Sequence, residues 1–346
     1  MSLFTATLII PTGIGAHIGG FAGDALPIAR VCSEICDRVI THPNVMNGAQ
    51  LYWPLKNALY VEGYGLDQFL AGHWQLTPVR QNRVGLLLDE GIEDDLKLRH
   101  IQAAEATRAT LGLTLTDYVV TDAPLNVQLQ TSASGASWGT IGNPDSLLRA
   151  AAKLIEQAGA TAIAIVVRFP EIEESVLQFY RQGSGVDPLA GAEAVISHLV
   201  VREFQIPAAH APALDPLPVD PSVSPRAAAE ELGYTFLPCV LVGLSRAPQF
   251  TMSVSAQSFG CDRVNALIVP ADACGGSGTL SFASSGGQII AVTENRTEMT
   301  VSPEALGLNA LRVHSYFDAL GVLAALKSGV DPQVLRANFP VLSRLD

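Results

Sequence analysis

The sequence lacks a long apolar run and lacks clustered basic residues, and each absence excludes a class of protein. No stretch approaches the roughly 18 consecutive apolar residues of a membrane-spanning helix. Lysine and arginine total 21 against 33 aspartates and glutamates, which gives a formal net charge of −12. Such an acidic chain has no general attraction for a nucleic-acid backbone. We therefore expect neither a nucleic-acid partner nor a membrane partner.

Cysteine is scarce, and the N-terminal segment has few features of a signal peptide. The five cysteines are an odd number without regular spacing, which does not predict a disulfide framework. The first ten residues contain no basic residue, and a proline and glycines follow their short apolar run. This pattern indicates a first β-strand. We therefore expect reduced thiols and a cytoplasmic protein.

Apolar residues are plentiful: they make up 48% of the 346 residues, and charged residues only 16%. This balance is typical of buried strands and broad helix-packing faces. It also favours a homo-oligomer, because part of an apolar surface can be covered by another copy. The length suits one large domain or two ordinary ones.

Short apolar runs alternate with glycine-rich turns and longer helical segments along the chain. The run 162–167 is fully apolar, as expected of a strand covered on both faces, and helical segments precede and follow it at 146–157 and 190–203. We also assign the apolar stretch 239–243 to a strand. The alternation predicts an α/β fold with a mostly parallel sheet and Rossmann-like layering.

The division into domains is less sharply marked. We place an N-terminal α/β region at residues 1–140 and a C-terminal α/β region at 141–346, with one integrated unit as the alternative. A short similarity between residues 19–25 and 271–278 raises the idea of two similar halves.

The most prominent local feature is a glycine-rich loop after the apolar strand 266–269. Glycine backbone approaches a ligand closely, and the N–H groups at a helix N-terminus favour an anion. The loop matches neither G-x-G-x-x-G nor G-x-x-x-x-G-K-[ST], and close strand-to-helix packing is the alternative explanation. The ligand-binding residues we expect here are Asp272, Cys274, Gly275, Gly276, Ser277 and Gly278.

Other polar residues follow further strands. Glu294 and Asn295 come after the strand 289–292, and we assign them to the same ligand site. Arg168 directly follows the strand 162–167, where a guanidinium is suited to hold an anion.

Acid–base chemistry is predicted near the first two strands. His17 and Asp24 lie in the loop after the first strand, and His42 follows the second. Glu62 follows a later apolar run. Histidine transfers protons near neutral pH, and a carboxylate orients it. We therefore expect His17 or His42 to act as acid or base, with Asp24 or Glu62 as its partner.

A metal site has weaker support. The chain has no H-E-x-x-H and no C-x-x-C, and the spacing of Cys32 and Cys36 is more typical of a helix core. We assign no metal ligand and identify no cofactor. A metal-dependent hydrolase that uses His17, His42, His198 and His210 remains an alternative.

Several stretches together resemble an uncharacterised conserved-hypothetical family, a domain of unknown function common in cyanobacteria and other bacteria. They are residues 41–45, 59–63, 142–145, 210–212, 271–278 and 294–297. Because these stretches span nearly the whole chain, the resemblance implies one evolutionary unit. It carries no catalytic role with it.

The residues themselves favour an enzyme acting on a small anionic metabolite bound at glycine-rich strand-end loops. A non-catalytic metabolite-binding, sensing or assembly protein is the alternative from another class. The two hypotheses share the glycine loop and differ in whether histidine chemistry is needed.

Overall fold

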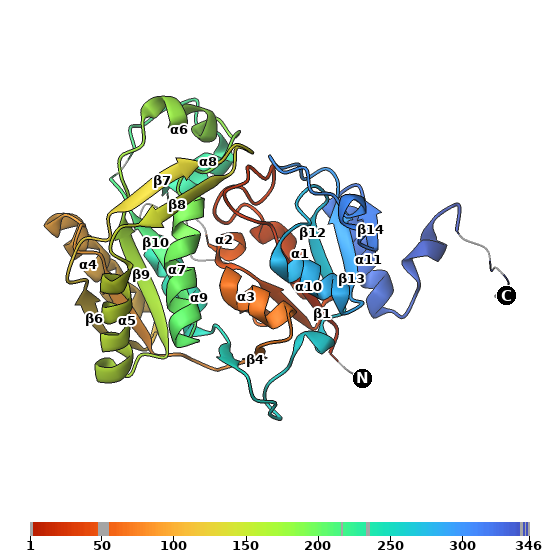
Figure 1. Cartoon of the computed structure of the whole chain (residues 1–346), viewed down its shortest axis with the longest axis horizontal. Helices are drawn as coiled ribbons and strands as arrows, with labels where there is room; N and C mark the ends of the chain where they lie inside the picture. The colour runs from red at the N-terminus through yellow and green to blue at the C-terminus, as the bar shows by residue number, and fades with distance from the viewer. Residues whose placement is uncertain are drawn as a thin grey trace.

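The computed structural model describes residues 3–47, 55–215, 217–232, 236–339, 342 and 344. Two parallel sheets lie side by side, with helices on the faces of each (Figure 1). The expected α/β fold with mostly parallel sheets is confirmed. The physical reason is that strands with continuous apolar runs, such as 162–167, must be buried on both faces by other elements.

The larger sheet has six parallel strands in the order β14-β13-β12-β1-β2-β3. This is the order of a doubly wound dinucleotide-binding fold, in which the chain turns outward in opposite directions from the two central strands. Its strands are β1 (Thr5–Leu8), β2 (Arg38–Thr41), β3 (Ala58–Tyr60), β12 (Ala266–Pro270), β13 (Gln288–Val292) and β14 (Ala310–Val313).

The second sheet has four parallel strands in the order β10-β9-β5-β6. It is built entirely from the segment that runs between β3 and β12. Its strands are β5 (Val84–Leu88), β6 (Leu115–Val120), β9 (Ala162–Arg168) and β10 (Ala208–Ala213).

Alternate residues of the central strands pack against different helices. In β12, Leu267 and Val269 belong to a core cluster with α3 (Gly63–Leu70) and α10 (Ser277–Ser284). Ile268 belongs to another cluster, with α1 (Leu26–Ile35) and α11 (Tyr316–Lys327). Both faces of this strand are therefore buried, because its side chains alternate between them.

The second sheet is covered in the same way. Helices α4 (Asp94–Leu111) and α9 (Leu237–Ser245) pack on one face, and α5 (Pro144–Ala158) and α7 (Ala190–Phe204) on the other. Helix α9 also contacts α2 (Pro43–Met46), which follows β2 of the larger sheet. One hydrophobic core therefore joins the two sheets.

The assignment of residues 239–243 to a strand is wrong, because they lie in α9. This helix is buried along its whole length, so its apolar run has no polar face to show a helical period. The suggested domain boundary between residues 140 and 141 falls inside β8 (Ser137–Ile141). The larger sheet takes three strands from before that point and three from after it.

The remaining elements connect or cover the two sheets. An antiparallel hairpin of β7 (Val127–Thr131) and β8 (Ser137–Ile141) packs on α7. The others are β4 (Gln75–Thr77), β11 (Gln249–Thr251), α6 (Glu174–Arg181), α8 (Pro225–Leu232), η1 (Cys261–Arg263), η2 (Glu304–Leu306) and η3 (Pro332–Leu335).

Candidate functional site

The carboxyl ends of β1 and β12 lie side by side at the point where the strand order reverses. Ligands of open α/β sheets bind outside the strands at such a point. The loop after β1 and the glycine-rich loop after β12, both expected from the sequence, begin here. His42, Glu62 and Glu294 also follow strands of this sheet, β2, β3 and β13.

Asn295 and Asp272 fix the loops at this edge. The Asn295 side-chain amide accepts a hydrogen bond from Ile18 N and donates to Ile18 O, both at 2.9 Å. Asp272 accepts from Thr297 N at 2.9 Å and from its hydroxyl at 3.0 Å. Glu294 accepts from Tyr316 N, at the start of α11. In the structure, the side chains of Asp272, Glu294 and Asn295 therefore form hydrogen bonds with other groups of the protein itself.

The glycine-rich loop leads into α10 as expected, and a carboxylate of the protein lies at the helix N-terminus. Asp67 accepts hydrogen bonds from Ser277 Oγ at 2.5 Å and from Gly278 N at 3.0 Å. Cys274 is fully buried, and burial raises the pKa of its thiol to about 11. Its sulfur is therefore a neutral thiol at physiological pH.

Three of the expected acid–base residues, His17, Asp24 and His42, lie in or next to the β1 loop. His42 is buried, and its Nε2 accepts a hydrogen bond from Ile10 N at 3.1 Å. Burial lowers the pKa of His42 to about 4, so its ring is neutral and its acceptor nitrogen is engaged. Asp24 contacts Arg226 at 3.2 Å, and burial raises the pKa of Asp24 to about 6. His17 is exposed and bonds through its backbone to Arg296 O.

Arg168 lies at the end of β9, in the four-stranded sheet. Its guanidinium contacts Glu93 at 3.0 Å and Asp215 at 3.7 Å. The structure therefore places Arg168 in an ion-pair group of the second sheet, and not beside the glycine-rich loop of the six-stranded sheet.

Glu62 has the richest set of contacts among the expected residues. It caps the N-terminus of α3, where Oε2 accepts from Tyr64 N at 2.9 Å and from Gly65 N at 3.2 Å. Its other oxygen, Oε1, lies 2.9 Å from His198 Nε2 and 3.5 Å from Ser197 Oγ. The Glu62 side chain is only 3% exposed, whereas that of His198 is 41% exposed. A buried carboxylate therefore orients a histidine that solvent reaches.

The environment of His198 favours its charged form. Burial lowers the pKa of His198, but the hydrogen bond to Glu62 and the charges of Glu62 and Asp67 outweigh burial and raise it. A Cβ added at Gly63 would lie 2.9 Å from His198 Nε2, so the glycine leaves room for the ring. The bond at Nε2 leaves Nδ1 as the ring nitrogen for proton exchange.

A second histidine extends this group toward several buried acids. His210, on β10, lies with Nδ1 3.1 Å from Ser197 Oγ and with Nε2 3.6 Å from Glu193 Oε2. Burial lowers the pKa of His210 to about 3, so its ring is neutral. Sequence reasoning named His198 and His210 only as metal ligands. The missed signal is the spacing of Glu193, Ser197 and His198, which places them along one helix.

Asp187 and Glu230 lie close to Glu193. Burial, followed by repulsion from Asp187, raises the pKa of Glu193, and the same two causes raise the pKa of Glu230 to about 8. Glu230 Oε2 accepts hydrogen bonds from Ala22 N and from the Tyr180 hydroxyl, both at 2.8 Å. Protonated carboxyls in this group relieve the repulsion between them.

Glu230→Gln should make the protein more stable at pH 8 than the wild type and change little at pH 5. A carboxyl whose folded pKa is raised loses stability as the pH rises from its ordinary value of 4.5 to its folded value of about 8. Glutamine keeps an acceptor for Ala22 N and cannot ionise, so we expect a gain of about 2 kcal/mol at pH 8. Urea unfolding at both pH values measures it.

Glu231→Gln is the matched control on the same helix. Glu231 pairs with Arg181 at 2.8 Å, so its neutralisation should cost stability at pH 8. An unchanged pH dependence in the Glu230 variant would contradict the assignment of the raised pKa.

Within the described ranges there is no group of three or more histidine, cysteine, aspartate or glutamate side chains that could hold a metal ion. Three histidines of the metal-hydrolase alternative have protein contacts instead: His42 with Ile10, His198 with Glu62, and His210 with Ser197.

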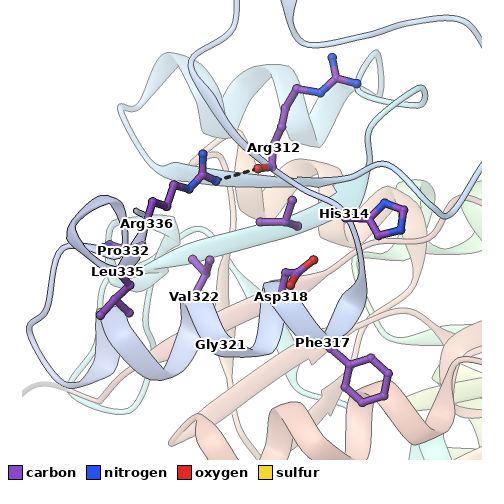
Figure 2. A pocket seen from close by; sticks show the side chains of 10 residues that line it. Arg312, His314, Phe317, Asp318, Gly321, Val322, Pro332, Leu335 and Arg336 are labelled. Carbon is purple, nitrogen blue, oxygen red and sulfur yellow. Dashed lines mark hydrogen bonds between the residues drawn. The ribbon is translucent and has the colours of Figure 1, made fainter. Parts of the chain in front are cut away.

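A pocket of about 400 Å³ lies elsewhere, between the end of β14, one side of α11 and η3 (Figure 2). Arg336 crosses its rim and donates to Arg312 O at 3.0 Å, as the dashed line in Figure 2 shows. None of the ligand-binding or catalytic residues expected from the sequence lines this pocket.

The fold and the Glu62–His198 pair define an α/β protein with a doubly wound sheet and a contact between a buried carboxylate and a histidine at its carboxyl edge. The chain belongs to the family described as "Protein of unknown function (DUF3326)", whose model matches residues 5–336. The resemblance to an uncharacterised family is thus confirmed.

A relative supports this membership. The chain is 57% identical over 345 residues to a protein of Synechococcus sp. (strain ATCC 27144 / PCC 6301 / SAUG 1402/1) named "Uncharacterized lipoprotein syc1174_c", covering 99% of this chain and 96% of that protein. No solved structure matches the chain significantly.

The helices give little sign of a membrane span. Over the described residues, no single helix is long and apolar enough to cross a membrane, and α8 with α9 qualifies only as a pair bent by 79°. The cytoplasmic location, the absence of a membrane or nucleic-acid partner, and the homo-oligomer stay predictions.

Proposed function

We propose that the protein is an enzyme that acts on a small anionic metabolite by acid–base chemistry, with His198 as the acid or base and Glu62 as the residue that orients it. The observation that carries the proposal is the 2.9 Å contact between His198 Nε2 and Glu62 Oε1, with the histidine side chain partly exposed and the carboxylate buried. A histidine held in this way by a carboxylate is suited to proton transfer.

The proposal keeps Glu62 from the sequence prediction and gives the histidine role to His198. His42 is less suited, since Ile10 N occupies its acceptor nitrogen and burial favours its neutral ring. The hydrogen bond from Ile10 N to His42 Nε2 holds the start of the loop that follows β1.

Two features support an anionic ligand. The raised pKa of His198 favours a positive charge at a position that solvent partly reaches. At the N-terminus of α10, Ser277 Oγ and Gly278 N donate to the carboxylate of Asp67, and donor groups of this kind are suited to an anion. Helix α3 connects the two features, because Glu62 caps it and Asp67 lies one turn further on.

A thermal-shift screen of carboxylates, sugar phosphates and nucleotides, followed by a turnover assay on each hit, tests the proposal. The wild type should be stabilised by at least one anion and convert it. His198→Gln should weaken that stabilisation and lower turnover by about 10²- to 10⁴-fold.

His73→Gln is the control, because His73 is an exposed histidine beyond the far end of α3. It should behave as the wild type does. Ligand stabilisation without turnover in the wild type would favour a binding or sensing protein. Full turnover in the His198 variant would overturn the acid–base role.

A further inference from the structure

Ser197, His210 and Glu193 form a continuous connection from the Glu62–His198 pair to the buried acids. His210 faces two residues that lie one turn apart on α7, with Nδ1 3.1 Å from Ser197 Oγ and Nε2 3.6 Å from Glu193 Oε2. Ser197 Oγ in turn lies 3.5 Å from Glu62 Oε1, the oxygen that contacts His198.

Two proton arrangements fit this geometry, and they differ at Glu62. The 3.6 Å between Glu193 Oε2 and His210 Nε2 is an ion-pair distance and not a hydrogen bond, so Glu193 acts on the ring through its charge. When Glu193 is neutral, His210 carries its proton on Nδ1 and donates to Ser197, and the Ser197 hydroxyl is shared between Glu62 Oε1 at 3.5 Å and Ala194 O at 3.4 Å. When Glu193 is ionised, its charge favours the His210 proton on Nε2, and Nδ1 accepts from Ser197. The single hydroxyl proton of Ser197 is then withdrawn from Glu62.

The arrangement matters for His198 because the same oxygen, Glu62 Oε1, accepts from its Nε2. A donated hydroxyl draws negative charge from Glu62 Oε1 and weakens its hold on the imidazolium. Withdrawal of that hydroxyl strengthens the hold.

We propose that the protonation of Glu193 is transmitted through His210 and Ser197 to Glu62 and sets how tightly His198 holds its proton. This inference rests on the proposed function and adds three positioning residues to it. The acid–base strength of the site would then follow the charge of a buried acid that does not itself touch the metabolite.

Glu193 lies among several other ionisable groups. It faces Asp187 before α7, Glu230 on α8, His210 on β10 and Tyr180 on α6. Burial and the two neighbouring carboxyls raise its pKa. His198 itself faces Glu62, Asp67 and His210.

A double-mutant cycle read by NMR titration of the His198 ring in the free, full-length protein tests the inference. Glu193→Gln removes the ionised state, so the His198 midpoint should fall by about half a unit to one unit. Ser197→Ala leaves Glu62 Oε1 without the hydroxyl, which is the same state of Glu62 that an ionised Glu193 produces, so the midpoint should stay near that of the wild type. With Ser197→Ala present, Glu193→Gln should have no further effect.

Two more variants make the result decisive. Glu203→Gln removes an exposed charge from the far end of the same helix and should leave the His198 midpoint unchanged. Ser197→Thr retains a hydroxyl and should restore the effect of Glu193→Gln, which separates loss of the connection from damage to the fold.

An effect of Glu193→Gln that is equally large with and without the Ser197→Ala substitution, or absent in both backgrounds, would overturn the inference. The experiment needs no metabolite, so its failure is distinct from failure of the proposed function. The latter fails if His198→Gln retains full turnover.

Discussion

Glu62→Ala should lower the free energy of unfolding by about 3 kcal/mol, because one side chain serves four partners. It removes the cap of α3, worth about 1 kcal/mol, and leaves Tyr64 N and Gly65 N without their acceptor. It also removes the buried partner of His198 and Ser197, and hydrogen bonds to a charged group contribute about 1.5–3 kcal/mol. Urea unfolding followed by circular dichroism measures the loss.

Glu62→Gln is the matched variant, since its amide oxygen can still accept from the first turn of α3. It should cost about 1 kcal/mol and leave the fold intact. Equal losses in the two variants would contradict the assignment of the cap. A negligible loss in both would contradict the whole contact set of Glu62.

Gly191→Ala should destabilise the protein by about 3 kcal/mol or more, since there is no space for a side chain where α7 meets the hairpin. A Cβ at Gly191 would lie 2.2 Å from Ser137 O and 2.4 Å from Ser137 C. These are backbone atoms of β8, which cannot rotate away, so the hairpin or the helix must shift. Thermal or urea unfolding measures the effect.

Gly321→Ala supplies the control within another helix, α11. A Cβ there meets no atom within 4 Å, so the change should be neutral or stabilise by about 0.5–1 kcal/mol. If Gly191→Ala were tolerated as well as Gly321→Ala, that result would contradict the close approach of α7 to the backbone of Ser137. That approach matters for the site because Ser137 N also donates to Gly13 O in the β1 loop, at 2.8 Å.

Local patterns were sufficient to predict the fold class and several of its central strands and helices. The continuous apolar run of β9 and the strand before the glycine-rich loop were located correctly, because fully covered strands carry few polar residues. The same rule failed at α9, whose complete burial hides its helical period. The six-stranded order could not be predicted, because β1 pairs with β12, which lies at the other end of the chain and is joined to it by no local pattern.

Part of the candidate site was predictable, and part depended on contacts between distant segments. Glu62 follows a strand and precedes a helix, which marks it as both a strand-end residue and a cap. Its partner His198 lies on a helix of the other sheet, and no local pattern links the two. Likewise, nothing near Gly278 in the sequence indicates that Asp67 lies at the N-terminus of α10.

The titration of His198 in the wild type and in Glu62→Gln, followed by NMR of the imidazole ring, tests the central claim most directly. If Glu62 orients and charges His198, loss of the carboxylate should leave burial as the dominant influence and lower the His198 midpoint by about one unit or more. The same midpoint in both proteins would show that the two side chains do not act as a pair.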